Sequence, residues 1–400
     1  MQRFPYWRLS AYYFAYFAFI GVYSPYFGLY LQSLSFSAWD IGLLMSQVQL
    51  TRVFGPYLWG LLADRSGRRL LIIRLSGVAA LLAFSAFFFI GRFASVMLAM
   101  AVFSIFWAAS LPQVEALTFD HLRDNPARYS RVRLWGSIGF IVVVQGCGAL
   151  LDQQPMVAVL WVGAASLLAM VLCSLRLPEA APHAPAAAAA AFGEILRQPR
   201  VRALLAASFA MAAAHGTFNI FYSIFLAAHG YSKALVGALF SLGVLAEIAV
   251  FFFMSRALRR FSLRVILLAC FAVAVVRFAL VGWGVDSLAL MVVTQLMHGL
   301  TFGAFHSAAI SAVNRWFSGA TRSRGQALYS SLSFGAGGLL GGLVSGWTWD
   351  RLGGGVSFAL SSLYALVGLL LVAIWIVDVG ENRTSRVKAG STAFRPPGRG

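Results

Sequence analysis

The chain alternates between long apolar runs and short polar separators along almost its whole length. Each run has the roughly 20 residues that a helix needs to cross a bilayer. A segment in lipid must satisfy its own backbone groups, which favours helices. The pattern therefore predicts twelve membrane helices, near residues 9–31, 39–62, 70–91, 94–120, 132–151, 156–177, 201–228, 234–255, 264–284, 286–314, 324–348 and 354–379.

One separator is longer than the others and divides the runs into two groups of six. Residues 178–200, rich in alanine and proline, predict a linker with a short amphipathic piece. The flanking halves echo each other, since Arg68-Arg69 corresponds to Arg259-Arg260 and residues 134–140 correspond to 328–334. We therefore predict an all-α membrane protein of two six-helix pseudo-repeats around a central site, as expected for alternating-access carriers. The predicted parts are bundles at 1–177 and 201–380 and a disordered cytoplasmic tail at 381–400.

Basic residues gather in one set of loops and predict the orientation. The N-terminus and the loops after even-numbered helices hold most of the arginines, whereas the opposite loops hold only Arg92, Lys233 and Arg351. Because basic loops stay in the cytoplasm, we expect a multi-pass protein of a bacterial inner membrane with both termini cytoplasmic. The first run is too long for the core of a cleavable signal and is expected to remain as a helix.

Composition excludes a soluble protein and gives the net charge a simple origin. Apolar residues make up 60% of the chain and charged residues 11%, whereas a soluble domain carries about 25% charged residues. The net charge of +18 reflects arginines retained in cytoplasmic loops, so no nucleic-acid partner is expected. The three cysteines lie in apolar runs without metal-ligand spacing, and no metal site is predicted.

Charged residues inside the predicted helices point to a cavity or a partner, since each costs about 2.5–3.5 kcal/mol or more at the membrane centre. Arg52 lies roughly 18 Å along a helix from Asp64, and it either faces the cavity or belongs to a buried ion pair. Glu115 and Arg133 are expected to form an ion pair that a polar substrate replaces, or else a permanent structural bridge. Arg277 is expected opposite Arg52 across the cavity, where arginines would bind an organic carboxylate through paired hydrogen bonds.

Histidines and one further carboxylate are candidates for proton coupling. His298 lies on a polar stripe of the tenth helix, and it either carries a proton or is a hydrogen-bonded core residue. The seventh helix presents His215 for the proton and Asn219 for the substrate. Glu247, on the eighth helix, is the carboxylate of the C-terminal half best placed for a protonation switch.

Motifs for hydrolysis are missing from the sequence. It contains no GxSxG, no HExxH and no Walker A lysine. A receptor would need a folded output domain, and only a linker and a tail are available. We therefore expect no enzyme, no ATP-driven pump and no cofactor, with the proton gradient as the source of energy.

Several segments carry a resemblance to a known family. They are residues 60–69, Phe19–Phe27, Val114-Glu115-Ala116, Arg131-Val132-Arg133, and the single residues Arg277 and His298. Over residues 4–380 the chain resembles the major facilitator superfamily, in the branch that holds lactose permease, the nucleoside permeases and the 3-phenylpropionate permease. The resemblance implies that Glu115, Arg133, Arg277 and His298 line the substrate and proton site.

The same resemblance gives a role to the stretch between the second and third helices. Its spacing predicts a tight cytoplasmic turn and is similar to the loop 2–3 signature of the superfamily. The residues concerned in this conformational-switch loop are Gly60, Asp64, Arg65, Gly67 and Arg68.

Departures from the resemblance narrow the substrate. Gln295 and Thr301 stand where lactose permease has a lysine and a glutamate, and Glu247 lies about one turn from that permease's acid, so lactose is not expected. Residues 133–140 and 298–306 look most like the phenylpropionate-permease type. We therefore predict a proton symporter, active as a monomer, that imports a small aromatic carboxylate such as 3-phenylpropionate. The alternatives are a nucleoside or sugar symporter and a drug exporter.

Overall fold

The computed structural model describes residues 4–122, 127–179 and 192–377, and all regular structure in these ranges is helical. The helices are α1 (Tyr6–Ser33), α2 (Ala38–Ser66), α3 (Arg69–Ser85), α4 (Phe93–Leu122), α5 (Ala127–Leu151), α6 (Ala158–Leu175), α7 (Phe192–Arg197), α8 (Pro199–Ala228), α9 (Lys233–Arg260), α10 (Leu263–Trp283), α11 (Leu288–His298), α12 (Phe305–Trp316), α13 (Arg322–Ser330) and α14 (Gly338–Trp375). Short 3₁₀ turns occupy Ala86–Phe88 and Gly319–Thr321.

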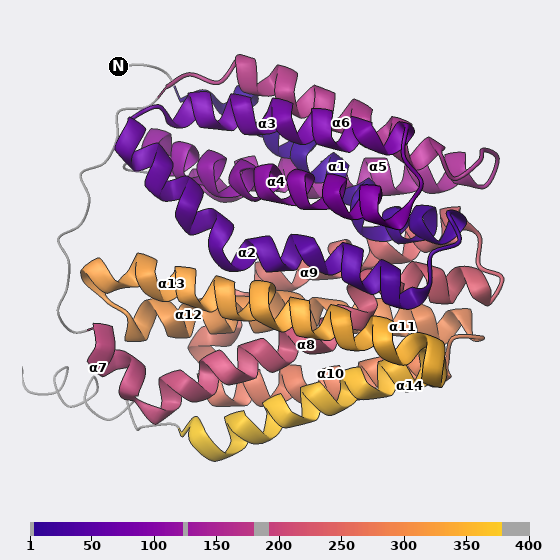
Figure 1. Ribbon diagram of the computed structural model, residues 1–400. Helices are drawn as coiled ribbons and strands as arrows, with labels where there is room; N and C mark the ends of the chain where they lie inside the picture. The colour runs from indigo at the N-terminus through magenta and orange to yellow at the C-terminus, as the bar shows by residue number, and fades with distance from the viewer. Residues whose placement is uncertain (1–3, 123–126, 180–191, 378–400) are drawn as a thin grey trace, which may run out of the picture.

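Two helical bundles lie side by side (Figure 1). Helices α1–α6 form the N-terminal bundle and α8–α14 form the C-terminal bundle, and the bundles meet where α2 packs on α14, α5 on α9 and α1 on α8. The short helix α7 matches the amphipathic piece expected in the linker, whereas residues 180–191 and the tail from 378 onward lie outside the described residues. The all-helical fold class is confirmed.

The membrane spans overlap eleven of the twelve predicted runs, since one long span covers the last two. Ten spans in the described ranges are long and apolar enough to cross a bilayer. They do not include α2, which has 29 residues but carries Gln47, Gln49 and Arg52 along its middle. Arg322–Trp375 is one of the ten, with 54 residues, although the backbone breaks at Gly353, where φ is 82°. If α2 is added and the last span is divided at Gly353, the described residues contain twelve long helical segments.

The end of α2 corrects the predicted turn. Gly60, Asp64 and Arg65 are helical, and the turn to α3 consists of only Gly67 and Arg68. Leu61, Leu62 and Ala63 between them favour a helix, and a single glycine inside a helix is tolerated. The helix stops at Gly67, whose φ of 63° is a left-handed conformation that lacks a steric penalty only for glycine.

Two helices of the C-terminal bundle contain wider π-helical turns. These segments are Gly299–Ala304, between α11 and α12, and Ser331–Gly337, between α13 and α14. Single π-helical turns occur most often at functional sites, because the extra residue redirects side chains. The second segment packs against α2 of the N-terminal bundle, whereas the first packs against α9 and its neighbours in the C-terminal bundle.

Helices α8 and α14 approach so closely that their backbones touch. A Cβ atom added at Gly216 would collide with the carbonyl carbon of Gly341. We expect Gly216→Ala to lower stability by about 1–3 kcal/mol, since backbone cannot move aside as a flexible side chain can. The unfolding midpoint of the purified protein in detergent should fall accordingly.

Gly146→Ala is the matched control, because nothing lies within 4 Å of a Cβ atom at that position. Its midpoint should stay the same or rise, as alanine is the better helix former. Equal midpoints for the two variants would contradict the close contact.

Candidate functional site

A small cavity of about 50 Å³ lies between the two bundles, and both contribute to its wall. The N-terminal bundle supplies two residues of α2, and the C-terminal bundle supplies residues of α8, α12, α13, α14 and both π-helical segments. The lining residues are Gln49, Arg52, Ser208, Met211, Ala212, His215, Asn219, Thr301, Phe302, Phe305, His306, Tyr329, Ser333, Phe334 and Gly338. A site shared by two halves is what alternating access requires.

Arg52 is the one arginine in the lining of this cavity, which contains no lysine, aspartate or glutamate. Its Nη1 atom donates to Oε1 of Gln49 at 3.3 Å. The ion pairs between described residues do not include Arg52, so no described carboxylate neutralises it. It lies close enough to Tyr16 and Tyr23 to interact electrostatically with both rings' hydroxyl groups. Of the two interpretations from the sequence, the structure shows the cavity wall and not a buried ion pair.

Aromatic side chains form the opposite part of the lining. Phe302 lies 6.2 Å from Phe334 between ring centroids, and Phe334 lies 5.6 Å from the ring of His306. The Nδ1 atom of His306 is 3.1 Å from the hydroxyl oxygen of Tyr329. Sequence reasoning missed Phe334 and Tyr329, because aromatic residues are common throughout a membrane protein and their spacing gives no signal.

His215 and Asn219 both line the cavity, as their shared face on one helix predicts. The Nε2 atom of His215 is 3.3 Å from Nη1 of Arg277, which can only donate. The Nδ1 atom of His215 must then carry the proton, which it donates to the carbonyl oxygen of Met211 at 2.9 Å. Both nitrogens of His215 are thus engaged inside the bundle.

Arg277 does not lie across the cavity from Arg52, and that expectation is wrong. The side chain is 0% exposed. Its Nε atom donates to the carbonyl oxygen of Thr294 at 2.9 Å, and Nη1 donates to the hydroxyl of Thr301 at 3.1 Å. Its guanidinium also stacks at 4.5 Å over the ring of Phe218. A buried guanidinium needs such partners. The nearby helices supply them for Nε and Nη1, whereas Nη2 has none among the described residues.

Glu247 and His298 are in direct contact in the C-terminal bundle. The Nε2 atom of His298 lies 2.8 Å from Oε1 of Glu247, and both side chains are slightly exposed. The Nδ1 atom of His298 is buried without a partner among the described residues. A carboxylate beside an imidazole is an arrangement that can hold or release one proton.

Glu115 and Arg133 do not form the expected ion pair in this state. Oε1 of Glu115 instead accepts a hydrogen bond of 2.9 Å from the hydroxyl of Tyr129. Arg133 lies 3.8 Å above the ring of Phe17. Tyr129 and Phe17 offer each charge a local partner that sequence spacing does not reveal. Arg133 also lies within electrostatic reach of Glu247, across the boundary between the bundles.

The loop between α2 and α3 has its ion pairs on a residue outside the predicted set. Arg69 contacts Asp64 at 3.2 Å and also pairs with Asp120 of α4. Arg65 and Arg68 are exposed, and Gly60 has open space beside it. Sequence reasoning found Asp64 but missed Asp120, because that contact joins residues 51 positions apart.

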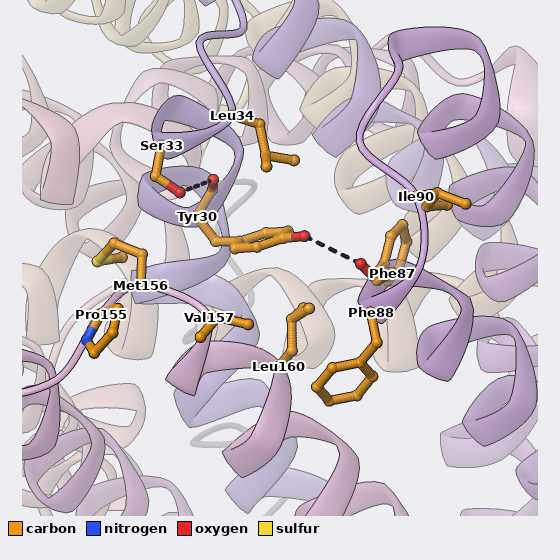
Figure 2. Close-up of a pocket in the computed structure, with 10 residues that line it drawn as sticks. All are labelled: Tyr30, Ser33, Leu34, Phe87, Phe88, Ile90, Pro155, Met156, Val157 and Leu160. Carbon is orange, nitrogen blue, oxygen red and sulfur yellow. Dashed lines mark hydrogen bonds between the residues drawn. The ribbon is translucent and has the colours of Figure 1, made fainter.

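A second cavity, of about 430 Å³, lies at the far end of the N-terminal bundle (Figure 2). It lies between the ends of α1 and α3 and the start of α6, and its polar contacts are internal. The hydroxyl of Tyr30 donates to the carbonyl oxygen of Phe87 at 3.3 Å, and Ser33 donates to the carbonyl oxygen of Tyr30 at 2.7 Å. No charged side chain lines it, so the inter-bundle cavity is the candidate site.

Comparisons with known proteins agree with this architecture. A family model described as "MFS_1 like family" matches residues 6–360. The chain is 30% identical over 365 residues to the "Probable 3-phenylpropionic acid transporter" of Escherichia coli, covering 90% of this chain and 95% of the relative. It is 24% identical over 344 residues to the nucleoside permease NupG of Escherichia coli, covering 78% and 80%.

Solved structures confirm the predicted fold. The crystal structure of the nucleoside transporter NupG superposes with a TM-score of 0.82 at 19% identity, covering 93% of this chain and 98% of that one. An inward-facing bacterial homologue of Spinster superposes with a TM-score of 0.64 at 16% identity, covering 93% and 96%. These relatives are named as transporters, which confirms the expectation of a transporter in place of an enzyme.

The described residues contain no group of three metal-ligating side chains.

The different surroundings of Arg277 and Arg52 predict different effects of their substitution on stability. Arg277→Ala should lower stability by roughly 2–5 kcal/mol, because it removes a buried side chain and leaves Thr294, His215 and Thr301 without their donor. Arg52→Ala should change stability by about 1 kcal/mol or less, since it faces the cavity. Thermal unfolding in detergent measures both, and a larger loss for Arg52→Ala would contradict this assignment.

Proposed function

This chain belongs to the MFS_1 like family and is a multi-pass membrane transporter, and from that premise we propose that it imports a small aromatic carboxylate together with protons. The observation that carries the proposal is the uncompensated charge of Arg52 on a cavity wall whose other end is aromatic. A charge in a membrane protein is stable when it has a partner. An anionic cargo would supply the partner that the described residues do not.

The chemistry of the cavity fits the two parts of such a molecule. A guanidinium binds a carboxylate through two parallel hydrogen bonds, and Gln49 already holds Arg52 by one nitrogen. Phe302, Phe305 and Phe334 offer faces and edges on which an aromatic ring can stack. One relative is named as a probable 3-phenylpropionic acid transporter, and 3-phenylpropionic acid is an aromatic carboxylic acid. This name supports the proposal.

A nucleoside is the second candidate, because the chain also resembles NupG in sequence and fold. Asn219, Gln49 and Ser208 line the same cavity and could bind a base edge or a sugar hydroxyl. A nucleoside would leave Arg52 without a counter-ion, and for this reason we favour the carboxylate. A sugar or an exported drug meets the same objection.

For proton coupling we propose the Glu247–His298 pair. It lies in the C-terminal bundle beside the lining of the cavity, and Arg133 of the other bundle lies within electrostatic reach of Glu247. Closure of the bundles around a cargo would alter that distance and with it the tendency of the pair to keep a proton. His215 is less suited, because both its nitrogens already have partners.

The remaining expectations stay part of the proposal. The arginine-rich loops predict that both termini lie in the cytoplasm of a bacterial cell and that the protein resides in the inner membrane. The end of the molecule where α2 and α9 begin would then face outward. A proton gradient, without a cofactor, would drive a single chain acting as a monomer.

Uptake of radiolabelled 3-phenylpropionate into proteoliposomes tests the substrate. An imposed proton gradient should drive accumulation, and a protonophore should abolish it. Arg52→Ala should raise KM about 10- to 100-fold, which corresponds to losing a charged hydrogen-bonded pair of about 1.5–3 kcal/mol. Arg92→Ala, which removes an exposed arginine outside the cavity, is the matched control and should behave as the wild type. Transport of uridine without transport of 3-phenylpropionate would establish the nucleoside candidate instead.

Glu247→Gln tests the coupling site. The amide keeps the size of the side chain and a hydrogen bond to His298 but cannot exchange a proton. Gradient-driven accumulation should be lost, whereas exchange of internal for external substrate should continue. Glu115→Gln is the control from the N-terminal bundle and should retain accumulation, since Glu115 is held by Tyr129. Full accumulation by Glu247→Gln would remove this residue from the mechanism.

A further inference from the structure

The first turn of α9 is capped by a residue from the other bundle. The first four N–H groups of a helix have no partner inside it. Asp152, which follows α5, accepts hydrogen bonds from the N–H groups of Lys233 at 2.7 Å and of Ala234 at 3.0 Å. The hydroxyl of Ser232 accepts the N–H of Leu235 at 3.2 Å. Two of the three caps of α9 therefore come from the N-terminal bundle.

The pseudo-symmetric position carries a weaker copy of this contact. Asp350, on the segment of α14 before its break, accepts the N–H of Trp39 at 3.4 Å. Ser37 caps the N–H of Asp40 at 3.1 Å, as Ser232 caps α9. Each bundle thus places one carboxylate on the first turn of a helix in the other, and the helix dipole adds attraction for a negative charge there.

Close packing surrounds both contacts. The hydroxyl of Tyr26 donates 2.8 Å to the carbonyl oxygen of Val144 on α5, and it lies 3.0 Å from that of Lys233 on α9. At the other contact, a Cβ atom on Gly42 would lie 2.9 Å from Cα of Gly346. The bundles are therefore held together at the end of the molecule where α2 and α9 begin.

No comparable bridge is found at the opposite end of α2 within the described residues. The ion pairs there join Arg69 to Asp64 and Asp120, and all three belong to the N-terminal bundle. Among the described residues, the cross-bundle caps lie at the end of the molecule where α2 and α9 begin.

We propose that Asp152 and Asp350 form a latch that holds this end closed and releases when the bundles part. Separation leaves three N–H groups and two carboxylates to water, so the caps stabilise the closed state relative to the open one. Asp152 dominates, because it makes two short hydrogen bonds and Asp350 makes one long one. The latch requires only that the bundles separate at this end, and it does not depend on which substrate or ion is carried.

A spin-label distance measurement tests the latch without any substrate. Cysteines at Gln154 and Ala228, which lie on opposite bundles at this end, carry the labels in a chain whose three native cysteines are replaced by alanine. Asp152→Ala should raise the ratio of long to short distances by about tenfold, a typical effect of losing a helix cap. Asp152→Asn, which retains one acceptor oxygen, should give an intermediate ratio, and Asp350→Ala a smaller change than Asp152→Ala.

Asp286→Ala is the matched control, because it removes an exposed carboxylate at the same end that interacts with Tyr231 of its own bundle. Its distances should equal those of the unsubstituted pair. An unchanged distribution for Asp152→Ala, or an equal shift for Asp286→Ala, overturns the proposal. If Asp152→Ala does not fold, the unsubstituted chain is compared with Asp152→Asn and Asp350→Ala. Both variants should then have a higher ratio of long to short distances than the unsubstituted chain, and equal ratios would overturn the proposal.

Discussion

The structure depends on how ionic groups are neutralised away from water. A buried guanidinium or carboxylate is tolerated only with partners, and nearly every charge inside the two bundles has one. Arg277 has three hydrogen-bond partners and an aromatic ring, and Glu247 has His298. Arg52 differs in that it lines the inter-bundle cavity, where the neutral side chain of Gln49 is its hydrogen-bond partner. In the function we propose, an anionic cargo would be the further partner of Arg52.

The cavity and the Glu247–His298 pair are neighbours, since the ring of His298 stacks at 5.5 Å on that of Phe302 in the cavity lining. The cavity lies between α2 and the C-terminal bundle, whereas the Glu247–His298 pair lies within that bundle. Arg133 belongs to the N-terminal bundle and interacts electrostatically with Glu247 of the C-terminal bundle. In the proposed mechanism it is the residue that links the cavity to the Glu247–His298 pair. In the mechanism we propose, a movement of one bundle against the other would change the electrostatic interaction between Arg133 and Glu247.

The hydrophobic pattern was sufficient to predict the helices, because a membrane span leaves a long and unambiguous signal. It could not predict partners that depend on side-chain direction. Glu115 and Arg133 have the spacing of an ion pair. Glu115 instead accepts a hydrogen bond from Tyr129, and Arg133 lies over the ring of Phe17. Arg277 was expected to face the cavity and faces its own bundle, because which side of a helix an arginine takes is decided by the neighbouring carbonyl and hydroxyl groups. The predicted turn after α2 was too long, because it began at Gly60, whereas the helix continues through Gly60 and ends at Gly67.

The polarity of α2 has a consequence for how the protein is made. Among the twelve long helical segments of the described residues, α2 is less apolar than a membrane span is expected to be. Lipid alone therefore stabilises its insertion only weakly. Its neighbours include α4, made soon afterwards, and α14, which is synthesised last. Until translation is nearly finished, the emerging chain therefore carries a helix whose polar face has no permanent shelter. Most of the contacts of α2 with the C-terminal bundle can therefore form only after the segments Ser331–Gly337 and α14 have been made.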